Sequence, residues 1–465
     1  NFQLFGKNDD DSDDIANLPN PSYSGKALWI SEGTLELQGY VKIPSLVELV
    51  NTATNGGDSP YFIPQNGKLI LNGANVEVYL ISRDKTYIET VWNLTPGSIL
   101  DADIGSISFG GASTWRNLLL HGYLQIIDGL FDFNGSSALQ YDAGSSAILE
   151  INGGALTVPQ IRPYTNGSGG DPVYIQTGGV FNVVGDSNGN GLLNGGNTNG
   201  SAFSWPSTEG TFRMSGGELI ISDVRTGRNA PNGLNVAVQD ANHSVTGGTI
   251  TINVAAGQTN GTDPFEIYFS PNFYNLVIQD DDGDPVEFQN DLVVSNDLTI
   301  EGASTSSIDL NGNNLTVGRN FILESGATYT QGGNNTTTFN GDAEQTITLA
   351  GTATTDFYDV LFSNSGLKNI SSGNLTATNN LTIENGSSIN DGGNTIFIEN
   401  IISNSGTHQS ETGGAIEFTG GGAAYSVDGD DSGVFGNVIL NDAANDVSFS
   451  ASQAVTGTLT FNQDQ

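Results

Sequence analysis

The chain has 465 residues, of which 62 are glycine and only 14% are charged, and it contains no cysteine. This composition excludes disulfide and thiol chemistry, and it is unlike that of a helical protein, which would be rich in Ala, Leu, Glu and Lys. The 51 acidic and 13 basic residues give a formal charge of −38, which excludes nucleic acid as a partner because phosphate contacts need Lys and Arg.

Residues 1–24 differ from the rest of the chain. They hold an acidic run from Asp9 to Asp14, followed by a stretch that contains proline. A stack of repeats needs a cover over its terminal coil, because an open sheet edge would pair with other chains. We therefore predict that residues 1–24 form a cap or a linker.

Residues 25–264 carry a repeated motif, Gly-x-Φ-x-Φ, in which Φ is apolar. Its leading glycines are Gly33, Gly67, Gly105, Gly129, Gly154, Gly179, Gly217 and Gly248. The shortest spacings, from Gly105 to Gly179, give a period of about 24 or 25 residues, and the longer spacings fit the same period with insertions. Alternating apolar residues predict a strand with one inward face, and the glycine predicts a turn with positive φ before it.

Residues 265–465 repeat on a larger scale. Similar segments begin at Phe273, Phe357 and Phe435, which gives a unit of about 80 residues, long enough for three or four coils. The third copy stops at Gln465, from which we expect that the natural chain continues or was cut within a repeat. The pairs Asn313-Asn314, Asn334-Asn335 and Asn379-Asn380 are predicted to stack as side-chain ladders between coils.

Together these patterns predict an all-β protein, a single elongated right-handed parallel β-helix (β-solenoid). It would consist of the cap or linker at 1–24, irregular coils with insertions at 25–264, and tandem repeats of about 80 residues at 265–465, the last of them incomplete. No run of 18 apolar residues occurs, so we expect no membrane-spanning segment.

The repeat in 265–465 reads FNG…Q-x-I…FYNLVI…LTI…GNNLTVG, quoted from Phe339-Asn-Gly341, Gln345-x-Ile347 and the segment after Phe273. It resembles repeats in very large secreted and surface proteins of Bacteroidota, many of them adhesin-like β-strand-repeat proteins and typically cargo of the type IX secretion system. The resemblance implies an extracellular or outer-membrane-attached location and contact with the secretion machinery. The secretion domain that such proteins carry at the C-terminus is not visible here.

The favoured functional reading is a non-enzymatic surface stalk or adhesin segment whose partners are extracellular glycans or surfaces. The alternative is an exported glycan-binding or glycan-cleaving β-helix. A third is cargo captured with the secretion machinery. Insertions that build one groove would favour the second reading, and scattered insertions would favour the first.

Calcium is the candidate cofactor, because several turns alternate carboxylate or amide oxygens as calcium loops do. The candidate ligands are Asp186, Asn188 and Asn190, then Asp280, Asp282 and Asp284, then Asp428 and Asp430. The run from Asp9 to Asp14 is a fourth such cluster. Turn chemistry alone would also explain these residues.

Aromatic side chains in the first half are candidate ligand-binding residues if they are exposed, since their faces stack on sugar rings. The candidates are Trp92, Trp115, Trp205, Tyr164 and Tyr174. They could equally fill the solenoid core or its insertions.

No catalytic residue is assigned. Asp101 with Asp103, or Asp128 with Asp132, could supply paired carboxylates, and Arg162 could be a lyase base. The dense motifs of polygalacturonases and pectate lyases are missing, however. The sequence contains three histidines, and none has a neighbour that indicates a triad or a zinc site.

Overall fold

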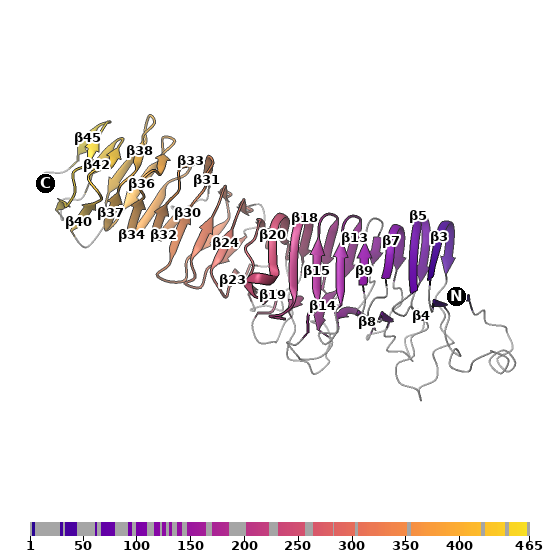
Figure 1. The fold of residues 1–465 in the computed structure, drawn as a ribbon. Helices are drawn as coiled ribbons and strands as arrows, with labels where there is room; N and C mark the ends of the chain where they lie inside the picture. Colours follow the sequence, from indigo (N-terminus) through magenta and orange to yellow (C-terminus); the bar gives the residue numbers. More distant parts are fainter. Residues whose placement is uncertain are drawn as a thin grey trace. The chain divides into compact units, whose positions relative to one another are not determined.

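The computed structural model describes single strands up to residue 141 and nearly continuous chain after it. The described ranges there are 147–163, 170–185, 201–222, 231–255, 264–281, 283–302, 306–350, 355–419, 424–441 and 446–462. These residues form short β-strands with almost entirely parallel pairing, and they contain no α-helix. The predicted parallel β-solenoid is confirmed (Figure 1). Its right-handed sense stays a prediction.

The chain divides into two compact units. The first consists of Asn1–Thr249, Gln258–Asp263 and Tyr268–Pro271, and the second of Ile250–Gly257, Pro264–Ile267 and Asn272–Gln465. The predicted boundary between residues 264 and 265 stays a prediction. Strands β20 (His243–Ile252) and β21 (Phe265–Phe269) contain residues of both units.

Two sheets build most of the first unit. One contains β3 (Gly33–Ile43), β5 (Gly67–Tyr79), β7 (Ile99–Ser108), β9 (Tyr123–Ile126), β10 (Leu130–Asp132), β12 (Ile148–Ile151), β13 (Ala155–Val158), β15 (Val173–Gln176), β16 (Val180–Val183) and β18 (Thr211–Ile221). The other contains β6 (Trp92–Leu94), β8 (Arg116–Leu120), β11 (Ser137–Tyr141), β14 (Gln160–Pro163), β17 (Phe203–Trp205) and β19 (Leu234–Val236). A small third sheet joins β1 (Phe2–Leu4), β2 (Leu28–Ile30) and β4 (Tyr61–Phe62), and β1 runs antiparallel to β2.

Glycine corners divide the coils of the first unit. Strand β7 pairs with both β9 and β10, and β18 pairs with both β15 and β16, so two short strands in one coil match a long strand in another. At the corners, Gly154, Gly179, Gly217 and Gly248 have φ values of 61°, 65°, 76° and 86°. The predicted positive φ is thus confirmed at these four motif glycines.

The register of the coils also follows the glycine spacing. Leu130 pairs with Ala155, Ala155 with Val180, and Val180 with Glu218. Each of these four residues directly follows a motif glycine, so every step of the register equals the spacing between the corresponding glycines. The period read from the sequence is therefore the length of one coil, and the longer last step holds an insertion.

Aromatic side chains fill the core of the first unit. The ring centroids of Tyr141 and Trp205 lie 4.2 Å apart, and those of Tyr174 and Phe212 lie 4.8 Å apart in a stacked pair. All four side chains are buried. The Tyr174 hydroxyl donates a hydrogen bond to Gln176 Oε1 at 2.6 Å, which satisfies its polar atom inside the core.

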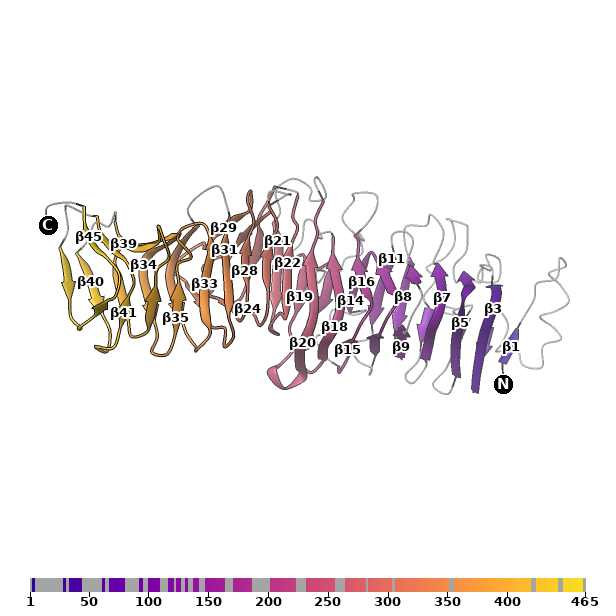
Figure 2. The same cartoon turned by 90° about the horizontal axis from the view of Figure 1, so that it is seen from above.

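The second unit stacks its strands in three sheets (Figure 2). The first, sheet B, contains β22 (Asn275–Ile278), β25 (Leu298–Ile300), β28 (Phe321–Leu323), β31 (Gln345–Leu349), β33 (Leu367–Ser372), β35 (Ser388–Asn390), β38 (Thr407–Gln409), β41 (Val434–Phe435) and β44 (Ala454–Val455), each paired with the next. At about 4.8 Å per strand, these nine strands extend over roughly 40 Å. Sheet C contains β21, β23 (Val286–Phe288), β26 (Ser307–Asp309) and β29 (Thr328–Thr330).

Sheet D of the second unit branches. Its main path contains β24 (Leu292–Val294), β27 (Leu315–Val317), β30 (Thr336–Phe339), β32 (Thr355–Phe362), β34 (Leu375–Ile383), β36 (Thr395–Ile398), β39 (Ala415–Phe418), β42 (Val438–Leu440) and β45 (Leu459–Phe461). From β34 a branch continues through β37 (Ile401–Asn404), β40 (Tyr425–Asp428) and β43 (Val447–Phe449). Coil lengths vary in this unit: in sheet B the registered partners Ile389 and His408 are closer in sequence than the partners Thr407 and Val434.

Side-chain ladders join the coils of the second unit at the corners. Asn275 Oδ1 accepts from the Asp297 N–H at 3.3 Å, Asp297 Oδ1 from the Asn320 N–H at 3.2 Å, and Asn320 Oδ1 from the Thr346 N–H at 3.0 Å. The predicted asparagine ladders are confirmed, because members of all three pairs bond to a neighbouring coil. The Asn335 amide donates to the Asn313 carbonyl at 2.7 Å, and the Asn400 amide donates to Asn379 Oδ1 at 3.0 Å.

Candidate functional site

Polar side chains occupy one inward-facing column of sheet B in the second unit. Gln345 pairs in register with Lys368, Lys368 with Ile389, and Ile389 with His408. All four side chains are buried. Burying a polar group costs free energy unless it is hydrogen-bonded, so each polar member of this column needs partners at the adjoining corner. We call these residues the polar column.

Backbone groups satisfy the first member. Gln345 Oε1 accepts a hydrogen bond from the Gly341 N–H at 3.1 Å, and its amide donates to the Val317 carbonyl at 2.8 Å. The side chain therefore ties two coils together at the corner before β31.

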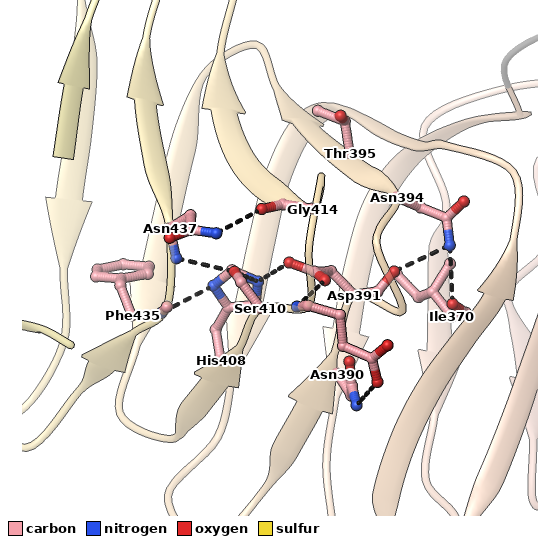
Figure 3. A network of polar contacts seen from close by, with 12 residues as sticks. Ile370, Asn390, Asp391, Asn394, Thr395, His408, Ser410, Gly414, Phe435 and Asn437 are labelled. Carbon is pink, nitrogen blue, oxygen red and sulfur yellow. Dashed lines mark hydrogen bonds and ion pairs between the residues drawn. The ribbon is translucent and has the colours of Figure 1, made fainter. Parts of the chain in front are cut away.

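The His408 ring is the centre of a buried network (Figure 3). Its Nε2 lies 3.2 Å from Asp391 Oδ2, and both side chains are fully buried. Its Nδ1 lies 3.3 Å from the Gly436 amide nitrogen, an N–H that can only donate. Nδ1 is therefore the acceptor, and we assign the ring proton to Nε2, from which it is donated to Asp391.

The Asp391 carboxylate is held by four donors. Oδ1 accepts from the Glu411 N–H at 2.9 Å and from the Gly393 N–H at 3.0 Å. Burial acts to raise the pKa of Asp391, but the hydrogen bonds from His408, the Glu411 N–H, Ser410 and the Gly393 N–H together hold it below its usual value. The carboxylate is therefore ionised at neutral pH.

Ser410 completes a set of residue types that resembles a nucleophilic triad, but the geometry is wrong for that role. A triad uses one ring nitrogen to take the serine proton and the other to bond the carboxylate. Here Ser410 Oγ lies 3.4 Å from Nε2, the atom that already faces Asp391, and the Gly436 N–H occupies Nδ1. Ser410 Oγ also accepts from the Asn437 N–H at 2.8 Å. The network connects three successive coils rather than activating a hydroxyl.

Sequence reasoning missed this pair, because it considered the histidines without their coil neighbours. Asp391 and His408 are 17 residues apart, and Ile389 is the registered partner of His408. The signal that could have located them is the coil period. The period is shorter from Ile389 to His408 than in the other registered pairs of sheet B that the structure describes. Asp391 follows Ile389 by two residues, directly after β35, and so lies at the corner beside the histidine.

The predicted calcium ligands are only partly described. Asp186, Asn188, Asn190 and Asp282 lie outside the described residues, whereas Asp280 is buried and Asp284 is half-buried. No group of three or more His, Cys, Asp or Glu side chains that could hold a metal ion occurs in the part of the chain that the structure describes. The calcium prediction stays a prediction.

At the third predicted cluster, hydroxyls and an amide contact the carboxylates. Ser426 Oγ donates to Asp428 Oδ1 at 2.8 Å, and the Asn385 amide donates to Asp430 Oδ2 at 3.2 Å. The Ser450 and Ser426 hydroxyls lower the pKa of Asp428 below its usual value. Ser426 lies on the same strand as Asp428, whereas Asn385 and Ser450 lie on other coils, so two of these contacts join coils.

The predicted ligand-binding aromatics divide into two groups. Trp205 and Tyr174 have no exposed surface and pack in the core of the first unit. These two side chains do not meet the condition of exposure set for ligand binding, because their strands β17 and β15 turn them inward. Trp115 and Tyr164 lie outside the described residues, and of Trp92 only the backbone of β6 is described.

Arg162 is the one candidate catalytic residue whose side chain falls within the described part of the chain. Arg162 lies buried on β14 at 5% exposure, so it is not open to a substrate. The side chains of Asp101, Asp103 and Asp132 and the whole of Asp128 lie outside the described residues.

No family model, curated protein or solved structure matches this chain. No helix in the described ranges is long and apolar enough to cross a bilayer.

Proposed function

We propose that the chain is a non-enzymatic segment of an extracellular or surface protein, a β-solenoid spacer of the adhesin type that displays the insertions of its first unit. This proposal rests on the observation that buried polar side chains join adjacent coils. His408, Asp391 and Ser410, which together could have formed an active site, bond adjacent coils to one another. Export by a secretion system of the type IX kind, and contact with extracellular glycans or surfaces, belong to the same proposal and are supported by the repeat resemblance.

The charge of the chain supports an exposed role. A formal charge of −38 favours solubility and disfavours self-association of a large β-protein. Between residues 265 and 465 the only basic residues are Arg319 and Lys368. Arg319 NH1 lies 3.9 Å from Asp297 Oδ2 in a partly exposed ion pair, and such a pair contributes little to stability.

The test compares binding with cleavage. The purified chain is incubated with panels of acidic and neutral polysaccharides, and reducing ends and retained sugar are both measured. We expect no release of reducing ends, and any retained sugar should be bound without being shortened. Cleavage by the wild type that is lost in Ser410→Ala or His408→Ala would contradict the proposal, and so would cleavage by any other residue.

A further inference from the structure

Lys368, the second polar member of the column, is a buried base in an acidic unit. Its side chain has no exposed surface, and it faces inward from β33 between Gln345 and Ile389. A buried ammonium group needs compensation, because the loss of its hydration is costly. In this case the compensation comes from the backbone.

Four carbonyl oxygens surround the Lys368 amine. Nζ lies 2.8 Å from the Gly366 oxygen, 2.9 Å from the Asn364 oxygen and 3.1 Å from the Gly341 oxygen. The Ser363 carbonyl is the fourth acceptor. Gly341 belongs to the preceding coil, and the other three belong to the turn between β32 and β33. We call these four oxygens the carbonyl shell.

An ammonium group has three N–H donors, whereas the shell offers four acceptors. The arrangement therefore resembles the coordination of a spherical monovalent cation, in which carbonyl oxygens replace water, more than a set of directed hydrogen bonds. The shell contains no carboxylate.

Contacts that do not involve Lys368 hold the shell in place. The Gly366 N–H donates to the Gly341 carbonyl at 3.2 Å, and the Asn364 amide donates to the Asn340 carbonyl at 2.7 Å. Asn364 has a φ of 61°, a conformation that asparagine tolerates better than most residues. A Cβ at Gly366 would lie 2.0 Å from the Ala343 oxygen, so this turn sits directly on the preceding coil.

The surrounding charge favours a cation. Burial lowers the pKa of Lys368 to about 8, and the nearby charges of Asp342 and Glu384 act to raise it. At pH 7 the amine is therefore protonated.

We propose that the carbonyl shell is a monovalent-cation site whose resident cation is the Lys368 ammonium group, and that it takes a free potassium or ammonium ion once this side chain is shortened. The site lies outside the surface-spacer function proposed above and does not depend on it. The Lys368 ammonium group would join two coils at a corner, where other coils are joined by asparagine and aspartate side chains.

The test measures thermal unfolding of Lys368→Ala at pH 7 and constant ionic strength, with the chlorides of potassium, ammonium, lithium and N-methylglucamine. A ligand that binds only the folded state stabilises it in a saturable way. We expect potassium and ammonium to restore much of the lost unfolding temperature, and lithium and N-methylglucamine to restore none. The wild type and Lys368→Met, whose side chain fills the site without a charge, should respond equally to all four salts. An equal response of Lys368→Ala to all four would overturn the proposal.

A measurement on the unaltered protein decides the matter if Lys368→Ala fails to fold. In protein labelled with ¹⁵N-lysine, an enclosed ammonium group should give an Nζ–H signal that exchanges with water more slowly than the signals of exposed lysines at pH 7. A neutral amine, or exchange as fast as that of the other lysines, would overturn the proposal.

Discussion

The close stacking of coils at glycine corners predicts a specific pattern of destabilisation in the second unit. Gly373, in the turn between β33 and β34, has a φ of 77°, and a Cβ there would lie 1.8 Å from the Leu349 carbonyl oxygen. Gly386, in the next turn, has a φ of 84°, but a Cβ there would meet nothing within 4 Å. The two sites share the strained backbone and differ in the contact with the neighbouring coil.

The two substitutions to alanine should therefore differ in cost. Left-handed φ costs a non-glycine residue roughly 1–2 kcal/mol, which is the whole effect expected for Gly386→Ala. Gly373→Ala adds overpacking of about 1–3 kcal/mol, so we expect a loss of about 2–5 kcal/mol in the free energy of unfolding. Gly318→Ala supplies the steric part alone, because its Cβ would lie 2.2 Å from the Ser295 oxygen while its φ is not positive.

The assay is urea unfolding of the three variants beside the wild type, followed by circular dichroism. Similar losses for Gly373→Ala and Gly386→Ala would refute the reasoning, because the contact with the preceding coil would then contribute nothing. A loss for Gly318→Ala within about 0.5 kcal/mol of zero, the range typical of surface substitutions, would do the same.

Three further predictions follow from the core, the buried carboxylate and the acidic turns. Trp205→Ala should destabilise the protein by about 3–5 kcal/mol through the cavity it leaves, whereas sugar retention by the folded fraction should be unchanged; a selective loss of retention would contradict the core assignment. The lowered pKa of Asp391 means that its contribution to stability is complete above the ordinary aspartate pKa of about 3.9 and is lost as pH falls through the folded-state value. The unfolding temperatures of wild type and Asp391→Asn, measured from about pH 5 to about pH 2.5, should converge at the acid end. Parallel curves would count against a stabilising role of the ionised Asp391 carboxylate. Calcium returned to chelated protein should raise the unfolding temperature if the loop at Asp186 or the turn at Asp428 binds it; an unchanged temperature with a flat calorimetric titration would exclude both.

Much of the architecture was predictable because the length of one coil equals the sequence spacing between equivalent residues in successive coils. The spacings of Gly129, Gly154 and Gly179 predict the register of β10, β13 and β16. The alternating apolar residues predict the inward faces of β13 and β16. In the second unit the period is less informative, because corner lengths vary. The segment after Phe273 forms β22 of sheet B, whereas the similar segment after Phe357 lies in β32 of sheet D. A repeated sequence therefore does not keep the same side of the coil from one copy to the next.

The polar interior could not be read from the sequence in the same way. Lys368 and His408 occupy positions where neighbouring coils carry Ile389 and Phe435, so the alternating pattern alone predicts apolar residues there. The partners of Lys368 are backbone carbonyl groups. His408 bonds Asp391 and the Gly436 N–H, which lie on the coils before and after it, so no local side-chain motif records either set. Trp205 and Tyr174 show a second limit of the sequence pattern. The sequence leaves ligand binding and core filling open for these aromatics, and their burial in the structure decides for the core.

The corner ladders of the second unit have a direction. In each ladder step described above for Asn275, Asp297 and Asn320, the side-chain oxygen belongs to the earlier coil and the backbone N–H to the later one. In these three steps each coil thus presents its acceptors to the coil that follows it. These ladder bonds are therefore polar along the unit, with donors on the C-terminal side of each step and acceptors on the N-terminal side. Removing the last coils leaves every earlier ladder donor bonded, whereas removing the first coils leaves donors of the next coil without acceptors.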